Sequence, residues 1–378
     1  MNKDKKLISE QKNIYFIFTS ITYLQLYISL VIEFSKLGYN NIFIVNDNGK
    51  NNSNPISNSN NRKLLKKYYK KNNFTIKNRY EDFDDINKFY DYLKNIIGIV
   101  FLVDGDMYGI KGKYVDSSLI HYLNKDKTLK ISLTEHLNFR ITYNSYIDLV
   151  DYCIMQNKLL AEYFNTISDK NLYLGNTKFD NIMDRVDIYK KYKLSREKKY
   201  CLLFYPKKIY FKKKYKNINS LTDLNKIYKF LEKLGYSIIV KTRPKDNNIM
   251  ANHKGILNVS SNYYPNESLE LLKISELCVI FESSANYEAL FMKVPCIDFR
   301  MKKISLSLKF NDLINDERIY IKFDNLKKLT YDDFIKKYNK LSKKNSSVFK
   351  KLRNKYVFHF KNSALNYIKF LKKNEYLK

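Results

Sequence analysis

The sequence has no tryptophan, five prolines, nine glycines and four cysteines among its 378 residues. The cysteines lie far apart, each in or beside an apolar run, at Cys153, Cys201, Cys278 and Cys296. Such spacing argues against a disulfide framework and against a zinc site, because both need cysteines in pairs or clusters. A reducing cytoplasm is the compartment that fits this pattern best.

Uninterrupted apolar runs of membrane-spanning length are also missing. The strongest candidate for a targeting segment, residues 14–34, is broken by polar side chains such as Thr19, Ser20 and Glu33, and no small-residue cleavage site follows it. We therefore expect a strand, a turn and a helix there. No internal repeat of solenoid length is visible, which argues against a repeat protein.

Acidic residues are scarce relative to basic ones, with 38 Asp and Glu against 69 Lys and Arg, so the formal net charge is +31. An excess of this size normally indicates nucleic acid or an anionic membrane surface as a partner. Here the excess is lysine and accompanies abundant Asn, Ile and Tyr, a composition typical of an AT-rich genome. Because no paired Cys/His site or aromatic RNP stretch accompanies the charge, we expect no nucleic-acid partner. An anionic membrane surface stays open as a partner.

Short β-rich runs alternate with helical patterns along most of the chain. The first such unit joins the run 13–20, the helical pattern 23–39 with Gly38 as its expected C-cap, and the run 41–46. Strand, helix and strand in this order predict a βαβ unit and a parallel sheet.

The alternation forms two series, which predict an α/β protein of two parallel-sheet domains, 1–182 and 183–328. Strands are expected at 96–106, 130–136, 152–157 and 171–176 in the first series, and at 200–206, 237–244, 277–284 and 295–299 in the second. The Lys-rich segment 329–378 has an apolar stripe at helical spacing and is expected to pack back on the domains. Ligands of such sheets bind outside the carboxyl ends of the strands, so we expect a site in a cleft between the domains.

Two serines, Ser283 and Ser284, stand where the strand 277–284 gives way to a helix. Backbone N–H groups and the positive end of the helix dipole favour phosphate at such a position. Plain N-capping is the more common role of serine at a helix start. Glu288 lies one turn further on, where its carboxylate could accept both hydroxyls of a ribose, and it favours a nucleotide over a simple cap.

The whole stretch "FESSANYEALFMKVPCIDF" (281–299) resembles the nucleotide-binding segment of GT-B type glycosyltransferases. The same segment occurs in their relatives, the non-hydrolysing UDP-GlcNAc 2-epimerases and the CDP-glycerol glycerophosphotransferases. Two further landmarks resemble these families in the same order: "YLGNTKFDNI" (173–182) closes the first domain, and "IIVKTRPKD" (238–246) ends a strand with a basic residue and proline. The resemblance covers about residues 13–300 and implies a GT-B fold of two Rossmann-like domains.

In these families the second domain holds a nucleotide-sugar donor, here expected to be UDP- or CDP-linked. The resemblance places Ser283 and Ser284 on the diphosphate, Glu288 on the ribose, and Arg243 with Lys241 beside the leaving phosphate. A helix dipole and an arginine stabilise departing negative charge without a metal, so we expect no metal and no separate cofactor.

On the acceptor side, His136 is the expected general base, with Glu135 and Asp106 as competitors, since a histidine of near-neutral pKa suits the removal of a hydroxyl proton. A purely structural role at a strand end is the alternative for His136. Tyr23 occupies the first strand-to-helix turn, where relatives place Gly or His near the acceptor. Asp104 and Asp106 could instead chelate Mg²⁺ or Mn²⁺ as in GT-A transferases, but the two-domain pattern argues against that fold.

Departures from the relatives guide the choice of reaction. Where epimerases have His-Arg after the first strand of the second domain, this chain has "YPKKIY" (205–210). After Glu135 it keeps Arg140 but has no carboxylate until Asp148. Epimerisation needs placed proton donors and acceptors, so these losses argue against it.

Glycerophosphotransferases typically show His-Gly and His-Pro where this chain has His136 followed by Leu137, and Arg243 before proline. The sequence therefore predicts a transferase that moves a sugar to a surface-glycan or lipid-linked acceptor. A UDP-GlcNAc 2-epimerase, a glycerophosphotransferase and a non-catalytic nucleotide-sugar-binding protein are the alternatives. The expected location is the cytoplasm, with peripheral attachment to the inner face of the plasma membrane left open.

Overall fold

The computed structural model forms two compact units, Met1–Asn181 with Phe358–Lys378 (unit 1) and Ile182–Val357 (unit 2). It describes these residues: 4–18, 23–45, 74–103, 115–134, 147–155, 161–162, 168–180, 182, 184–206, 221–242, 257–258, 267–281, 283, 285–300, 316–356 and 362–378. Among them, no helix is both long and apolar enough to cross a bilayer.

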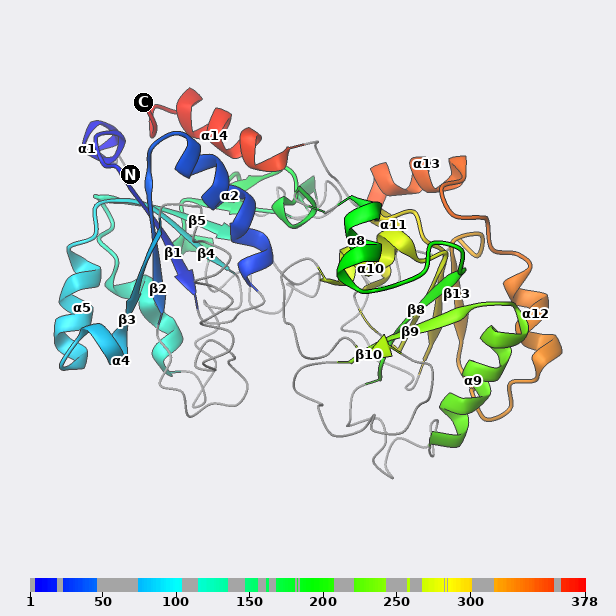
Figure 1. Cartoon of the computed structure of the whole chain (residues 1–378). Coiled ribbons are helices and arrows are strands. Elements are labelled where there is room, and N and C mark those ends of the chain that lie inside the picture. Colours follow the sequence, from blue (N-terminus) through cyan, green and yellow to red (C-terminus); the bar gives the residue numbers. More distant parts are fainter. Residues whose placement is uncertain are drawn as a thin grey trace. The chain divides into compact units, whose positions relative to one another are not determined.

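A seven-stranded parallel sheet runs through unit 1 in the order β3-β2-β1-β4-β5-β6-β7 (Figure 1). The strands are β1 (Asn13–Phe18), β2 (Asn40–Val45), β3 (Phe74–Asn78), β4 (Gly98–Val103), β5 (Thr128–Leu133), β6 (Tyr152–Ile154) and β7 (Asn171–Leu172). The chain builds outward from β1 in one direction and then from β4 in the other. The strand order therefore reverses between β1 and β4, which is where ligands of open parallel sheets bind. The parallel pairing confirms the predicted βαβ pattern.

Two long helices, far apart in the sequence, cover one face of this sheet. The helices of unit 1 are α1 (Lys5–Ser9), α2 (Leu24–Lys36), α4 (Arg79–Asp82), α5 (Ile86–Lys94) and α14 (Ser363–Lys373), with the 3₁₀ turns η4 (Val115–Tyr122), η6 (Ile147–Leu149) and η7 (Thr177–Phe179). Phe101 of β4 contacts Phe34 of α2 and Tyr367 of α14 with ring centroids 5.8 and 6.4 Å apart. Phe16 of β1 stacks on Phe101 at 5.3 Å, so aromatic rings form the centre of this core.

The end of α2 shows why the chain turns where it does. Gly38 has a φ of +80°, a left-handed conformation that costs a glycine little. The N–H of Tyr39 donates to the carbonyl of Phe34 at 3.0 Å, and that of Gly38 to the carbonyl of Ser35 at 3.0 Å. These two bonds are a Schellman motif, which confirms Gly38 as the predicted C-cap and feeds the chain directly into β2.

Unit 2 contains a six-stranded parallel sheet of order β10-β9-β8-β11-β12-β13. Its strands are β8 (Tyr200–Phe204), β9 (Ser237–Lys241), β10 (Leu257–Asn258), β11 (Leu277–Ile280), β12 (Cys296–Phe299) and β13 (Tyr320–Phe323). Its helices are α8 (Arg185–Lys191), α9 (Leu221–Lys233), α10 (Glu267–Ile274), α11 (Ala285–Phe291), α12 (Tyr331–Tyr338) and α13 (Ser347–Tyr356). Here the strand order reverses between β8 and β11.

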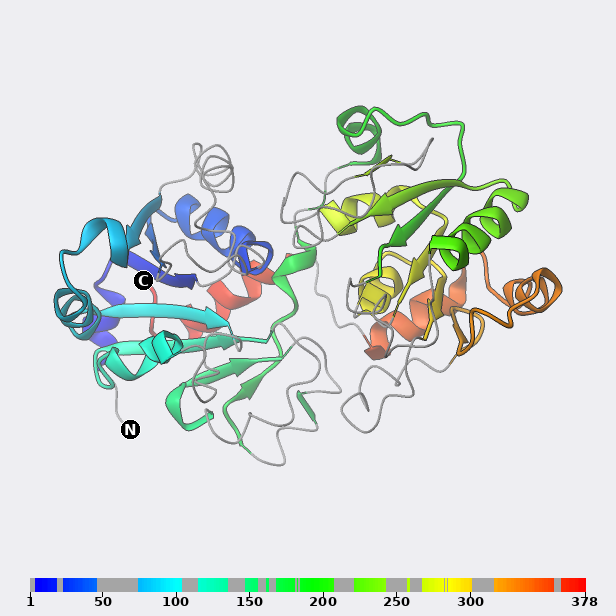
Figure 2. The same cartoon turned by 90° about the horizontal axis from the view of Figure 1, so that it is seen from below.

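The core of unit 2 lies between the sheet and the helices α9 and α12 (Figure 2). Leu203, Val279 and Phe299 point to this face from three strands and pack with Leu231 of α9 and Phe334 of α12. The opposite face receives α10 and α11, which follow each other in the chain on either side of β11. This second face carries the polar residues of the candidate site.

The C-terminal segment divides between the units. Helices α12 and α13 belong to unit 2, and α14 belongs to unit 1, where it packs against α2. The chain thus enters unit 2 after Asn181 and leaves it after Val357.

Candidate functional site

The carboxyl edge of the unit 2 sheet carries charged residues on both sides of the point where the strand order reverses. In register, Lys241 of β9 pairs with Phe204 of β8, Ile280 of β11 with Asp298 of β12, and Asp298 with Lys322 of β13. Register partners of parallel strands point to the same face, and the β8–β11 register continues the row. Lys241 and Asp298 therefore flank the reversal point on the face that receives α10 and α11.

Lys241 is held by a carboxylate. Its Nζ lies 2.9 Å from Oε2 of Glu267, the first residue of α10, and the two side chains are only 12% and 4% exposed. Burial raises the pKa of Glu267, while the ammonium groups of Lys241 and Lys191 act to lower it. The positive charge expected beside the leaving phosphate is thus compensated by Glu267 in this structure.

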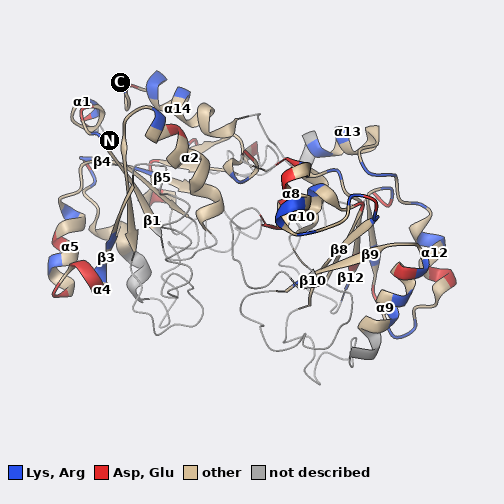
Figure 3. Ribbon diagram, in the orientation of Figure 1, with Lys and Arg blue, Asp and Glu red and all other residues tan. Residues whose placement is uncertain are grey.

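A second carboxylate on α10 joins the same helix to α8. Oε2 of Glu270 accepts a hydrogen bond from Lys191 Nζ at 2.6 Å and another from Tyr192 Oη at 2.6 Å. Burial and this carboxylate raise the pKa of Tyr192 well above its usual range. Figure 3 marks the basic and acidic residues of α8 and α10. No role was predicted for Glu267 or Glu270.

The segment after β11 places Ser283 at the start of α11. The Ser283 hydroxyl accepts a hydrogen bond from the backbone N–H of Ala285 at 3.3 Å, as a capping serine does. Glu288 lies one turn into α11 and is partly buried, with its Oε2 shielded from solvent. Ser284 lies outside the described residues, so the expected serine pair is seen through Ser283 alone.

Near the end of β12, the buried Asp298 contacts the hydroxyl of Tyr320 and the guanidinium of Arg300. Asp298 accepts a hydrogen bond from Tyr320 Oη at 2.5 Å, and its Oδ2 lies 3.7 Å from Nε of Arg300. Burial, reinforced by the Asp298 carboxylate, raises the pKa of Tyr320 far above its usual range. Arg300 directly follows the last residue of β12 and therefore lies at the same carboxyl edge of the sheet as Lys241. Its side chain is 25% exposed.

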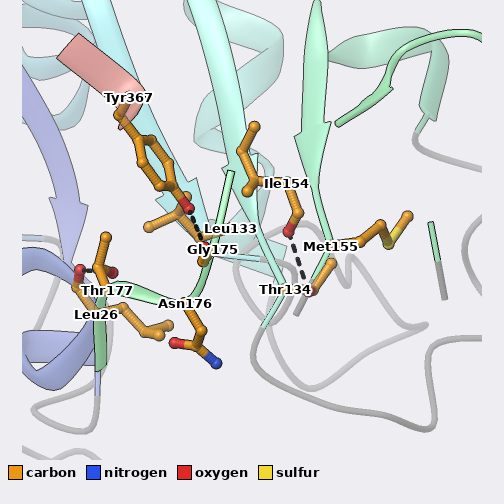
Figure 4. A pocket seen from close by; sticks show the side chains of 9 residues that line it. All are labelled: Leu26, Leu133, Thr134, Ile154, Met155, Gly175, Asn176, Thr177 and Tyr367. Carbon is orange, nitrogen blue, oxygen red and sulfur yellow. Dashed lines mark hydrogen bonds between the residues drawn. The ribbon is translucent and has the colours of Figure 1, made fainter. Parts of the chain in front are cut away.

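The carboxyl edge of the unit 1 sheet borders a small pocket of about 10 Å³ (Figure 4). Its lining consists of Leu133 and Thr134 at the end of β5, Ile154 and Met155 at the end of β6, Gly175, Asn176 and Thr177 before and in η7, Leu26 of α2 and Tyr367 of α14. None of these nine side chains carries a charge. The pocket has room for about one water molecule.

The Gly-Asn-x-x-x-Asp segment forms one wall of this pocket and is bonded to α2 and α14. Thr177 Oγ1 donates to the carbonyl of Leu26 at 2.6 Å, and Ser29 Oγ donates back to the carbonyl of Thr177 at 3.0 Å. Tyr367 Oη donates to the carbonyl of Gly175 at 3.2 Å. Gly175 has a φ of +95°, which other residues rarely adopt. The segment is therefore a junction of three elements.

Asp180, the acidic residue of that segment, caps α14. Its Oδ1 accepts the backbone N–H of Ser363 and its Oδ2 that of Ala364, both at 2.8 Å. Burial raises the pKa of Asp180 to about 6, although the two backbone N–H groups oppose the rise. The Gly-Asn-x-x-x-Asp segment, which resembles a family landmark, thus has a structural function in this chain: its aspartate caps α14.

The remaining predicted residues stay predictions. His136, Glu135 and Asp106 lie outside the described residues, as does Arg243. Tyr23 is buried, directly before α2 in unit 1. Glu267, Asp298, Tyr320 and Arg300 were not predicted, because no local motif marks them.

No protein-family model and no curated protein matches the sequence. Solved structures do match the fold. The wall teichoic acid polymerase TagF is similar over 98% of this chain and 91% of its own, with a TM-score of 0.60 and 15% identity. The UDP-GlcNAc 2-epimerase of Methanocaldococcus jannaschii is similar over 96% of this chain and 99% of its own, with a TM-score of 0.61 and 14% identity.

A third similar structure is the glycotransferase of kitacinnamycin, which covers 97% of this chain and 99% of its own, with a TM-score of 0.55 and 8% identity. Similarity along nearly the whole length of each chain shows that this protein has the GT-B fold with two Rossmann-like domains, as the sequence resemblance implied.

Proposed function

We propose that this protein is a GT-B enzyme that transfers a sugar from a nucleotide-sugar donor to a surface-glycan or lipid-linked acceptor. The observation that supports it most is the carboxyl edge of the unit 2 sheet, where Lys241, Ser283 and Arg300 lie at or just after the ends of three different strands around the point of reversed strand order. Ligands of open parallel sheets bind at such points, and the residue types suit an anion.

In this proposal the donor diphosphate lies beside Ser283, Ser284 and the basic residues Lys241 and Arg243. The Glu288 carboxylate accepts hydrogen bonds from the ribose hydroxyls. Positive charge and oriented backbone N–H groups stabilise the negative charge that develops on the leaving nucleotide, so the transfer needs no metal. Arg300, which the sequence analysis missed, is a further cation at this edge.

On the acceptor side, we assign removal of the hydroxyl proton to His136, with Glu135 and Asp106 as alternatives, and contact with the acceptor to Tyr23. The likeness to a wall teichoic acid polymerase and to a glycotransferase supports a glycan or lipid-linked acceptor, and the lysine-rich sequence supports contact with an anionic membrane surface. We place the enzyme in the cytoplasm.

Binding of nucleotides tests the donor site. We expect UDP or CDP to bind the wild-type protein, and Glu288→Ala to weaken that binding by about 1 to 3 kcal/mol through the lost charged hydrogen bonds. Isothermal titration calorimetry measures both. Glu276→Ala is the matched control, because Glu276 is a half-exposed glutamate of the same unit. Equal affinity of wild type and Glu288→Ala for UDP and CDP would contradict the assignment of Glu288.

Turnover separates the reaction classes. Radiolabel passing from a nucleotide sugar into membrane lipid supports the transferase. Formation of UDP-ManNAc from UDP-GlcNAc alone, followed by NMR, would instead establish the epimerase. Binding without either reaction would leave a nucleotide-sugar-binding protein.

A further inference from the structure

The ion pair between Lys241 and Glu267 lies at the place where the donor phosphate is proposed to bind. Lys241 ends β9 at the sheet edge, and Glu267 begins α10. With 2.9 Å between Nζ and Oε2 and both side chains almost fully buried, the pair is nearly dry. A phosphate that arrives here meets an ammonium group already engaged by a carboxylate.

The neighbouring charges explain how Glu267 responds to such a ligand. Lys241 is its direct partner, and Lys191 of α8 acts on it from further away. Lys191 and Tyr192 bond to Glu270 instead, at 2.6 Å each. Burial and the negative charge of Glu270 both favour the neutral form of Glu267. The positive charge of Lys241 opposes them and stabilises the ionised form of Glu267.

We propose that binding of a phosphate group at the carboxyl end of β9 is coupled to uptake of one proton by Glu267. This inference rests on the proposed function, because it takes the donor diphosphate as the ligand. A solvent proton adds to the Glu267 carboxylate, the Lys241 ammonium group turns from that carboxylate to a phosphate oxygen, and no covalent bond of the ligand changes.

The physical reason is that two anions beside a single ammonium group repel each other, and in a nearly dry site this repulsion costs free energy. A phosphate beside Lys241 adds negative charge next to Glu267 and draws away its positive partner, and both effects favour the protonated carboxyl. Glu267 is thus a positioning residue: it holds Lys241 at the sheet edge and makes donor affinity rise as the pH falls.

Calorimetric titrations test the coupling with three ligands, UDP, CDP and inorganic pyrophosphate. They are run from about pH 5.5 to about pH 8 on wild type, Glu267→Gln and Glu276→Gln, the last being a change at a half-exposed glutamate of the same unit. Coupling to one proton changes affinity by up to about tenfold per pH unit. We expect this dependence in wild type and in Glu276→Gln, and its loss in Glu267→Gln. The ligand's own titration is the same for all three proteins and cancels in the ratio of their affinities.

A second measurement needs no variant and stands even if Glu267→Gln fails to fold. Titration of wild type in buffers of different ionisation enthalpy reports the protons exchanged on binding. We expect net uptake, whereas a purely cationic site promotes ionisation of the phosphate and releases protons. Net release would overturn the coupling.

The outcomes separate this inference from the proposed function. A wild-type pH dependence in Glu267→Gln would overturn the coupling and leave nucleotide binding intact. Coupled binding of pyrophosphate without binding of UDP or CDP would support the coupling and contradict a nucleotide donor. If none of the three ligands binds at any pH, both are overturned.

Discussion

In unit 1 the strands β5 and β6 end at a pocket lined by nine uncharged residues, whereas in unit 2 the strands β9 and β12 end at Lys241 and at Asp298 with Arg300. The two sheets nevertheless share a construction. Each is parallel, and in each the order of the first six strands is third, second, first, fourth, fifth, sixth. Topology thus sets where a ligand meets each sheet, and side chains at the strand ends decide its chemistry.

The difference extends to how each unit holds its outer helices. In unit 2, charged groups of α10 bind α8 and the end of β9 through Glu270 and Glu267. In unit 1, hydrogen bonds from neutral side chains and one aspartate fasten α14 and α2 to the segment around η7. Three measurements test this contrast.

Removal of the charge that joins α8 to α10 has the largest expected effect. Glu270→Ala leaves the Lys191 ammonium and the Tyr192 hydroxyl without their carboxylate, and breaking a buried ion pair in this way costs about 3 kcal/mol. Urea unfolding followed by circular dichroism measures the loss. Glu276→Ala, at a half-exposed position, is expected to lose less than about 0.5 kcal/mol. Equal losses of unfolding free energy in the two variants would mean that the buried carboxylate of Glu270 stabilises unit 2 no more than a half-exposed one does.

The pH dependence of unit 1 follows from Asp180. Its pKa is about 6 in the folded protein, above its usual value of 3.8, so its stabilising contribution is complete below about pH 4 and is lost as the pH rises through 6. We expect wild type to lose about 2 kcal/mol relative to Asp180→Asn between pH 4 and pH 7. Urea unfolding of both proteins across this range measures it. A constant difference would show that Asp180 titrates normally.

The smallest effect concerns the neutral wall of the pocket. Tyr367→Phe removes the hydrogen bond to the Gly175 carbonyl but keeps the ring against Phe101, so we expect a loss of about 1 kcal/mol. Thermal unfolding measures it against Tyr80→Phe, because the Tyr80 side chain is exposed. If both variants melt at the wild-type temperature, the bond to Gly175 does not fasten α14.

Much of the fold was predictable because the buried strands are short apolar runs between helical patterns. Three strands were missed, β3 (Phe74–Asn78), β10 (Leu257–Asn258) and β13 (Tyr320–Phe323), and each of them lies at the end of its sheet. β3 is mostly half exposed, and Lys77 and Lys322 interrupt the apolar pattern of β3 and β13. Strands at a sheet edge bury less surface and therefore show weaker patterns.

The site was predictable where a motif marks it and not where distant strands create it. Ser283, Lys241 and Glu288 were predicted from local segments that resemble a family, and their roles stay predictions. Glu267 lies 26 residues from Lys241, and Tyr320 lies 22 residues from Asp298. These partners meet only through strand order and register, which the periodicity of a single segment does not contain.

The bond between Asp180 and α14 has a consequence for how the protein is made. Its two partners are 183 and 184 residues further along the chain, with all of unit 2 between them. During synthesis, the strands of both sheets therefore leave the ribosome before α14, the helix that completes unit 1. Until α14 is made, the apolar side chains of α2 that pack against it are exposed. Nascent chains stalled before Ser363 are therefore expected to need protection from aggregation.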